Sequence, residues 1–83
     1  MEVAVREEVL PESEKRERMA YTSFMIHEFA EAFKMNKPEG YRYLEKYGGL
    51  DYIRENWWAL HIDNQHHVLL EIFDLCKRNG GYL

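Results

Sequence analysis

The chain is 83 residues long, 46% hydrophobic and 14% aromatic, and its formal net charge at pH 7 is −4. This length suits one domain with a modest core, and the apolar content excludes a disordered chain. The acidic balance disfavours nucleic acid and anionic membranes as partners. The single cysteine, Cys76, excludes an intrachain disulfide and indicates a cytoplasmic protein.

We predict no helix or strand packed on the core for residues 1–10. Val3 and Val5 alternate with polar neighbours, but a lone strand would have no partner in a helical chain. The stretch also lacks the apolar run of a signal peptide, and no uncharged stretch of the chain approaches the length of a membrane span. We expect a flexible tail over 1–10 and a single helical domain over 11–83.

A long helix is predicted over 11–35. Pro11 marks its start, Ser13 is a candidate cap, and pairs such as Glu14 with Arg18 have favourable i,i+4 spacing. One apolar stripe of this helix contains Met19, Ile26, Phe29, Ala30 and Phe33. A second stripe, on nearly the opposite side, contains Tyr21, Phe24, Met25, Ala32 and Met35. A surface helix normally buries one stripe, so we expect Tyr21, Phe24 and Met25 to form an interface.

A glycine hinge joins the next two helices. Asn36 is a good N-cap for a helix over 37–47, and Pro38 falls in its first turn, where a missing N–H is tolerated. Gly48 stands where a left-handed residue ends a helix, and Gly49 lets the chain turn into the next one. The expected apolar face of this hairpin contains Tyr41, Leu44, Tyr47, Leu50, Ile53 and Trp57.

Trp57 and Trp58 are adjacent, so they point in different directions on a helix. One can lie in the core, and the other then reaches a second surface. We therefore add both tryptophans to the predicted interface.

The last helix is predicted over 65–79, after a loop over 60–64 that provides Asp63 or Asn64 as its cap. Its expected buried side contains Val68, Leu69, Ile72, Phe73, Leu75 and Cys76. Its expected polar side contains His67, Glu71, Asp74 and Arg78. The complete pattern predicts an all-α fold of about four helices.

Two histidine–glutamate pairs at i,i+4 spacing, His27 with Glu31 and His67 with Glu71, could each give two metal ligands. A site needs about three or four ligands, and the sequence has neither Cys-x-x-Cys nor His-Glu-x-x-His. We therefore expect solvated helix surfaces here, and we predict no metal and no cofactor.

His61 has two interpretations. It could act as a general acid or base, or its ring could cap backbone carbonyls in a turn. No serine, cysteine or paired carboxylate stands at a spacing typical of catalysis, so the structural role is favoured and we predict no enzyme. Cys76 falls on a buried side, which favours a small core residue over a nucleophile.

The segment EGYRYLEKYGGLDYIRENWWALH resembles the core of a bacterial family of short proteins named domain of unknown function 3791. Its members carry a tyrosine-rich helix, a KYG-like hinge, a leucine–aspartate–tyrosine helix and a Leu-His pair. The matching segments here are 41–44, 46–48, 50–52 and 60–61. The resemblance covers roughly 19–75, but this chain has Ile62 and Asp63 where members tend to have threonine and glutamine.

The resemblance implies no catalytic residues. Members of the family look like partners of neighbouring genes, some of which encode proteins similar to ADP-ribosyltransferase toxins. This implies an antitoxin-like or accessory role.

We therefore expect a small cytoplasmic protein–protein interaction module, working as a homodimer or with another protein. The alternative is a DNA-binding regulator that uses the hinge as a helix-turn-helix. Its reading helix would carry Asp51, Arg54 and Glu55, and one arginine against two carboxylates is a poor face for phosphates.

Overall fold

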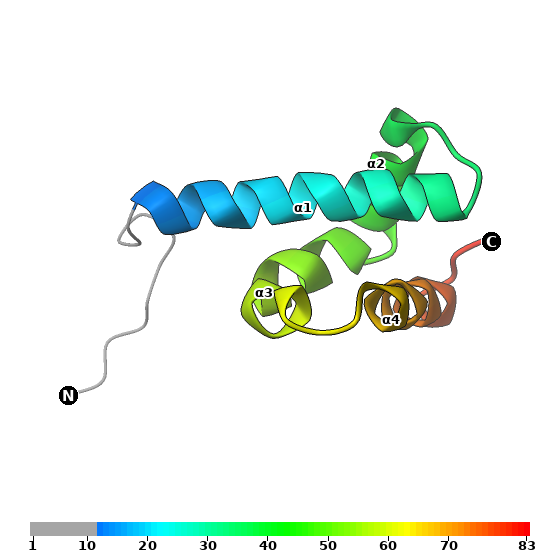
Figure 1. Cartoon of the computed structure of the whole chain (residues 1–83). Helices are drawn as coiled ribbons and strands as arrows, with labels where there is room; N and C mark the ends of the chain where they lie inside the picture. The colour runs from blue at the N-terminus through cyan, green and yellow to red at the C-terminus, as the bar shows by residue number, and fades with distance from the viewer. Residues whose placement is uncertain (1–11) are drawn as a thin grey trace.

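The computed structural model describes residues 12–83, and four helices account for most of them (Figure 1). The helices are α1 (Glu12–Ala32), α2 (Lys37–Lys46), α3 (Gly49–His61) and α4 (Gln65–Arg78). No strand occurs in this part of the chain, so the predicted all-α fold is confirmed. The tail predicted over 1–10 lies outside the described residues.

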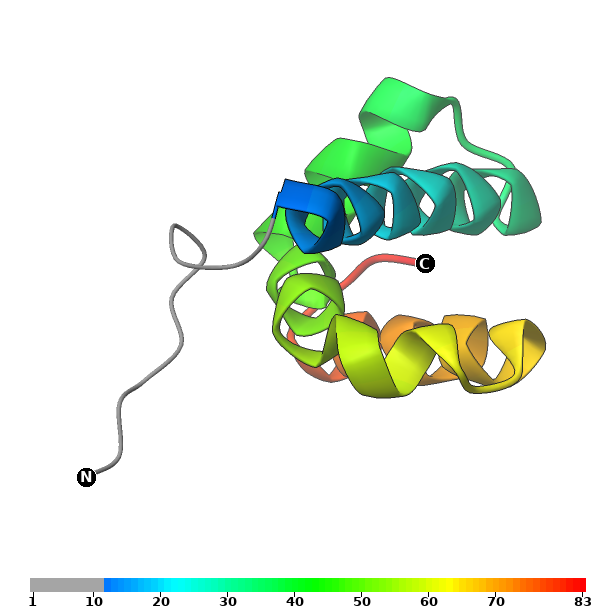
Figure 2. The ribbon, with the colours of Figure 1, turned by 60° about the vertical axis from the view of Figure 1, so that its left-hand side comes forward.

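The long helix α1 lies along one side of the molecule, and α3 and α4 lie together on the other side (Figures 1 and 2). α1 contacts mainly α2 and α3, and α4 packs mainly on α3. The first turns of α1 extend past the other helices, and no residue from Glu12 to Met19 is buried.

The core includes one α1 residue that we predicted to lie on an outer surface. Ile26, Phe29 and Ala30 of the first predicted stripe are buried, but so is Met25, which is 0% exposed. The placement of Met25 on an exposed interface is therefore wrong. Because α2 and α3 both contact α1, they cover a wider sector of it than one stripe. Met19, at the extended end of α1, is 66% exposed instead of packed.

The start of α2 follows the sequence prediction. The side-chain oxygen of Asn36 accepts a hydrogen bond from the Glu39 amide at 2.9 Å, and the Glu39 carboxylate accepts one from the Asn36 amide at 3.0 Å. This reciprocal pair is a capping box, and Pro38 lies in the first turn. Two otherwise unpaired amides are thus satisfied at the point where α2 begins.

The buried face of α2 differs from the prediction. Tyr43 and Leu44 are buried, whereas Tyr41 is exposed. The cause is Gly40: a Cβ there would lie 2.8 Å from the Ala30 side chain, so only glycine lets α1 approach this closely. The contact turns Gly40, Tyr43 and Leu44 inward, and Tyr41 lies one residue further round the helix.

The two hinge glycines have different roles. Gly48 has φ 85°, the left-handed conformation predicted for it. Gly49 is the buried first residue of α3, where a Cβ would meet Leu44 Cδ2 at 2.7 Å and Cys76 Sγ at 2.9 Å. Gly48 therefore ends one helix by its backbone conformation, and Gly49 lets the next one pack closely.

α3 is longer than predicted. We expected a loop over 60–64, but Leu60 and His61 belong to the helix. Leu60 is 5% exposed, and its burial accompanies the continuation of the helix to His61. Asn64 then caps α4, as predicted, by accepting a hydrogen bond from the His67 amide at 3.1 Å.

α1 ends earlier than predicted because Lys34 adopts a left-handed conformation with φ 61°. The Met35 amide then donates to the Ala30 carbonyl at 2.8 Å, which is the closing bond of a Schellman motif. A non-glycine residue in this conformation is strained.

We expect Gly48→Ala to lower the free energy of unfolding by about 1 kcal/mol, and Gly48→Val by more, because a Cβ is penalised at positive φ. Lys34→Gly should act in the opposite direction, by about 0.5 kcal/mol, because it removes the same penalty at the end of α1. Urea unfolding followed by far-UV circular dichroism measures the free energy of unfolding of each variant. An unchanged midpoint for Gly48→Val would contradict the backbone assignment.

Candidate functional site

Aromatic side chains gather where the end of α3 meets α1. Of the five residues predicted to form an interface, the structure leaves Trp58 65% exposed, Phe24 45% exposed and Tyr21 partly exposed. It buries Met25 and Trp57, so those two cannot contribute outer surface. We name the remaining group, with His61, the aromatic surface: it consists of Tyr21, Phe24, Trp58 and His61.

His61 connects the members of the aromatic surface. Its ring centroid lies 4.9 Å from that of Trp58, 4.8 Å from that of the buried Trp57, and 6.3 Å from that of Tyr21 in an edge-on arrangement. Sequence reasoning singled out His61 but did not place it with the interface residues, because its helical position was predicted as loop.

The backbone fixes the orientation of the His61 ring. Nδ1 lies 3.0 Å from the Trp57 carbonyl oxygen and 2.7 Å from that of Trp58. Carbonyl oxygens only accept, so Nδ1 carries the proton and donates to both. The ring thus caps carbonyls in the last turn of α3, which is the contact that the structural interpretation of His61 expects.

A hollow of about 310 Å³ lies beside the aromatic surface. It is lined by Tyr21, Phe24, Met25, Leu60, His61, Asp63 and Gln65. This lining combines apolar side chains, such as Phe24 and Leu60, with polar ones, such as Asp63. The Gln65 amide donates to the Glu28 carboxylate at 2.7 Å, which ties α4 to α1 beside the hollow.

Two shifted pKa values describe the charges at this hollow. Burial, and secondarily the charge of Asp63, raises the pKa of the Tyr21 hydroxyl. Hydrogen bonds from the Asn64 amide and from His67 hold the pKa of Asp63 below its ordinary value. At neutral pH the hollow therefore presents a protonated phenol and an ionised carboxylate, and neither is set up for proton transfer.

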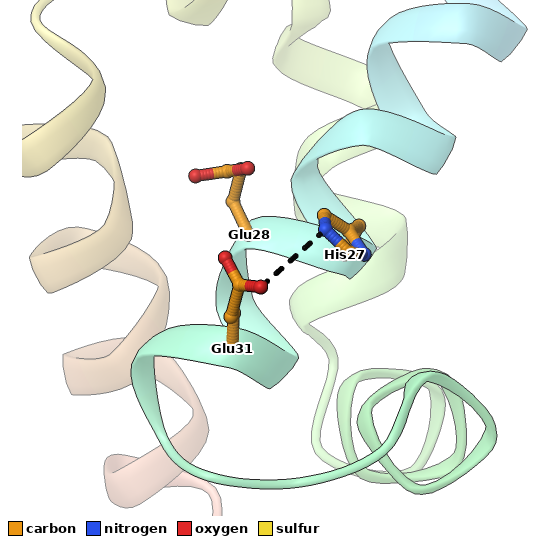
Figure 3. Close-up of side chains that lie close together, drawn as sticks. All are labelled: His27, Glu28 and Glu31. Carbon is orange, nitrogen blue, oxygen red and sulfur yellow. Dashed lines mark ion pairs between the residues drawn. The ribbon is translucent and has the colours of Figure 1, made fainter.

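The two histidine–glutamate pairs that were considered as metal ligands each have a third neighbour in the structure. In the described part of the chain, the two groups are His27 with Glu28 and Glu31, and Asp63 with His67 and Glu71, with ligand atoms within 4.8 Å of one another. Figure 3 shows the first group, in which His27 Nε2 lies 3.8 Å from Glu31 Oε2.

Both groups are open to water. The His27 and Glu31 side chains are 53% and 73% exposed, and Gln65 already engages Glu28. In the second group, the His67 side chain is 59% exposed. A metal ion bound by such exposed ligands would remain open to water on most sides. We therefore expect either group to bind a metal ion weakly.

We expect the purified protein to carry no stoichiometric metal after dialysis, because each group offers three ligands, most of them exposed to water, and its members already pair with one another or with Gln65. Elemental analysis measures this, and His67→Ala and His27→Ala provide matched controls. Near-stoichiometric zinc that disappears in one of these variants would contradict the expectation and identify the site.

Cys76 lies in the core, as predicted, and is 0% exposed. Burial raises the pKa of its thiol, partly offset by a hydrogen bond from the Gly49 amide. A protonated thiol without access to solvent is not a nucleophile.

The described residues therefore form a small all-α domain with an exposed aromatic surface. Within them, no helix is both long and apolar enough to cross a membrane. The sequence model of the family described as "Protein of unknown function (DUF3791)" matches residues 20–79. The chain belongs to this family, as the resemblance predicted. Comparison with curated proteins and with solved structures gives no match.

Proposed function

We propose that this protein is a small cytoplasmic protein-interaction module, without catalytic activity, that binds through the aromatic surface. The observation that carries the proposal is Trp58, which is 65% exposed although the adjacent Trp57 is buried. Tryptophan and tyrosine are enriched at interfaces because they combine a large rigid contact area with a polar atom.

Phe24 and His61 support the same proposal. Phe24 lines the hollow together with Tyr21 and His61, and the His61 ring contacts the ring of Trp58. Exposed apolar residues are therefore contiguous across α1 and α3 instead of scattered, and contiguous patches mark interaction sites.

The simplest partner is a second copy of the chain, because a self-complementary patch closes into a symmetric dimer. A different protein is the other choice. The family resemblance favours the product of a neighbouring gene, and an antitoxin-like role would be one form of that interaction.

The alternative function is DNA binding through α2, Gly48 and α3. The exposed side of α3 carries Asp51 and Glu55 beside Arg54, which disfavours phosphate contacts. Sub-micromolar, salt-sensitive binding to duplex DNA would favour the alternative.

We expect Phe24→Glu to convert dimers into monomers while leaving the helical content nearly unchanged. A carboxylate at this exposed position would be desolvated in the interface but not in the monomer. Sedimentation velocity over a range of protein concentrations measures the change. Leu70→Glu is the matched control, because Leu70 is 50% exposed on α4 and does not line the hollow.

A compact wild-type monomer at high micromolar concentration, with no affinity for the products of neighbouring genes, would overturn the proposal. Equal effects of Phe24→Glu and Leu70→Glu would show that the aromatic surface is not the site of self-association.

A further inference from the structure

A second hollow, between α1 and α3, has different chemistry from the aromatic surface. It has a volume of about 230 Å³. We name it the arginine groove, and it is lined by Arg18, Met19, Thr22, Ser23, Ile26 and Arg54. Two arginine side chains thus line one small hollow in a chain whose net charge is −4.

Neither arginine is neutralised by the residues that the structure describes. The ion pairs found within 12–83 are His27–Glu31, His67–Asp63, His67–Glu71 and Arg78–Asp74, and they include neither Arg18 nor Arg54. Arg18 Nε is also buried and has no hydrogen-bond partner among these residues. A buried donor without an acceptor is costly, so the Arg18 side chain is held in an environment that does not fully satisfy its hydrogen-bonding groups.

The Arg18 side chain is held in place by Trp57. Its Cζ atom lies 5.9 Å from the centroid of the Trp57 ring, within range of a cation–π contact. This contact orders the guanidinium before any ligand arrives, so less side-chain entropy is lost on binding.

A hydroxyl and a further cation lie at the groove. Lys37 Nζ donates to Ser23 Oγ at 2.9 Å, so the Ser23 hydroxyl hydrogen is free to donate to an anion. The Thr22 hydroxyl donates to the Arg18 carbonyl at 2.8 Å and is already used. Met19 and Ile26 add apolar lining beside these donors.

We propose that the arginine groove binds an acidic peptide segment of a protein partner, taking a carboxylate side chain between Arg18 and Arg54 and an adjacent aliphatic side chain against Met19 and Ile26. The inference rests on the proposed function, that the domain binds proteins. Guanidinium groups pair with carboxylates in a fixed two-pronged geometry. The volume lies below the roughly 300 Å³ at which small-molecule pockets begin, which suits side chains better than a nucleotide.

The test uses the full-length chain and two capped dipeptides that differ in one group. N-acetyl-glutamyl-leucine amide presents the carboxylate and the aliphatic side chain, and N-acetyl-glutaminyl-leucine amide is its neutral counterpart. Proton–nitrogen correlation NMR follows the titration. We expect the acidic dipeptide to shift the backbone amide signals of Ser23 and Arg54, and to bind about three- to fivefold more tightly than the neutral one at low salt.

Arg54→Gln should remove that difference, whereas Arg42→Gln, at an exposed arginine of α2 outside the groove, should leave it intact. Arg54 is exposed, so its replacement is expected to preserve the fold, and the dispersion of the same NMR spectra checks this.

Equal binding of both dipeptides, or no shift with either, would overturn the inference. Tighter binding of inorganic phosphate, measured in the same way, would overturn the choice of a peptide.

If Arg54→Gln weakens self-association in sedimentation, a second copy occupies the groove instead. Phe24 does not line the groove, so the two proposals can fail separately. Self-association that depends on Phe24 but not on Arg54 would support the proposed function. The dipeptide titrations would then test the arginine groove independently.

Discussion

Burial of Trp57 beneath α1 is the contact on which both candidate surfaces depend. Its side chain is 4% exposed, with the Arg18 guanidinium over its ring and the His61 ring 4.8 Å away. Because the two tryptophans are consecutive on a helix, fixing Trp57 inward directs Trp58 outward. The same ring orders Arg18 in the arginine groove and supports the aromatic surface through His61.

Local features of this fold could be predicted from the sequence because a few neighbouring residues determine them. The cap at Asn36 and the left-handed Gly48 depend on backbone groups within one turn, and both were predicted correctly. The different orientations of Trp57 and Trp58 follow from helical geometry, and the buried one, Trp57, belongs to the apolar face predicted for the hairpin.

Features that depend on helix–helix contacts could not be predicted. Tyr41 and Tyr43 fit the helical pattern equally well, and the close approach at Gly40 selects Tyr43 for the core. Met25 was assigned to an outer surface because its stripe is distinct in sequence, but the helices packed on α1 bury it as well. Arg18 and Arg54 are far apart in the chain, and only the packing of α3 on α1 brings them to one hollow.

The proposed function is recognition, and two potentially reactive side chains of the described residues have structural roles. Cys76 is enclosed in the core, and the proton on His61 Nδ1 is held by two carbonyls. The exposed groups include the aromatic Trp58 and Phe24, the Arg54 side chain and scattered surface charge. These groups gain free energy when a partner removes them from water, and the buried tryptophan positions them in advance.

The most direct measurement of the central claim is fluorine NMR of the full-length chain labelled with 5-fluorotryptophan, recorded over a range of concentrations. The two tryptophan signals can be assigned with Trp58→Phe, and Trp57 serves as an internal control. If the aromatic surface is an interface, the Trp58 signal should shift and lose its sensitivity to solvent deuteration as the protein associates, while the Trp57 signal stays constant. A Trp58 signal that remains solvent-exposed in the associated state would contradict the account.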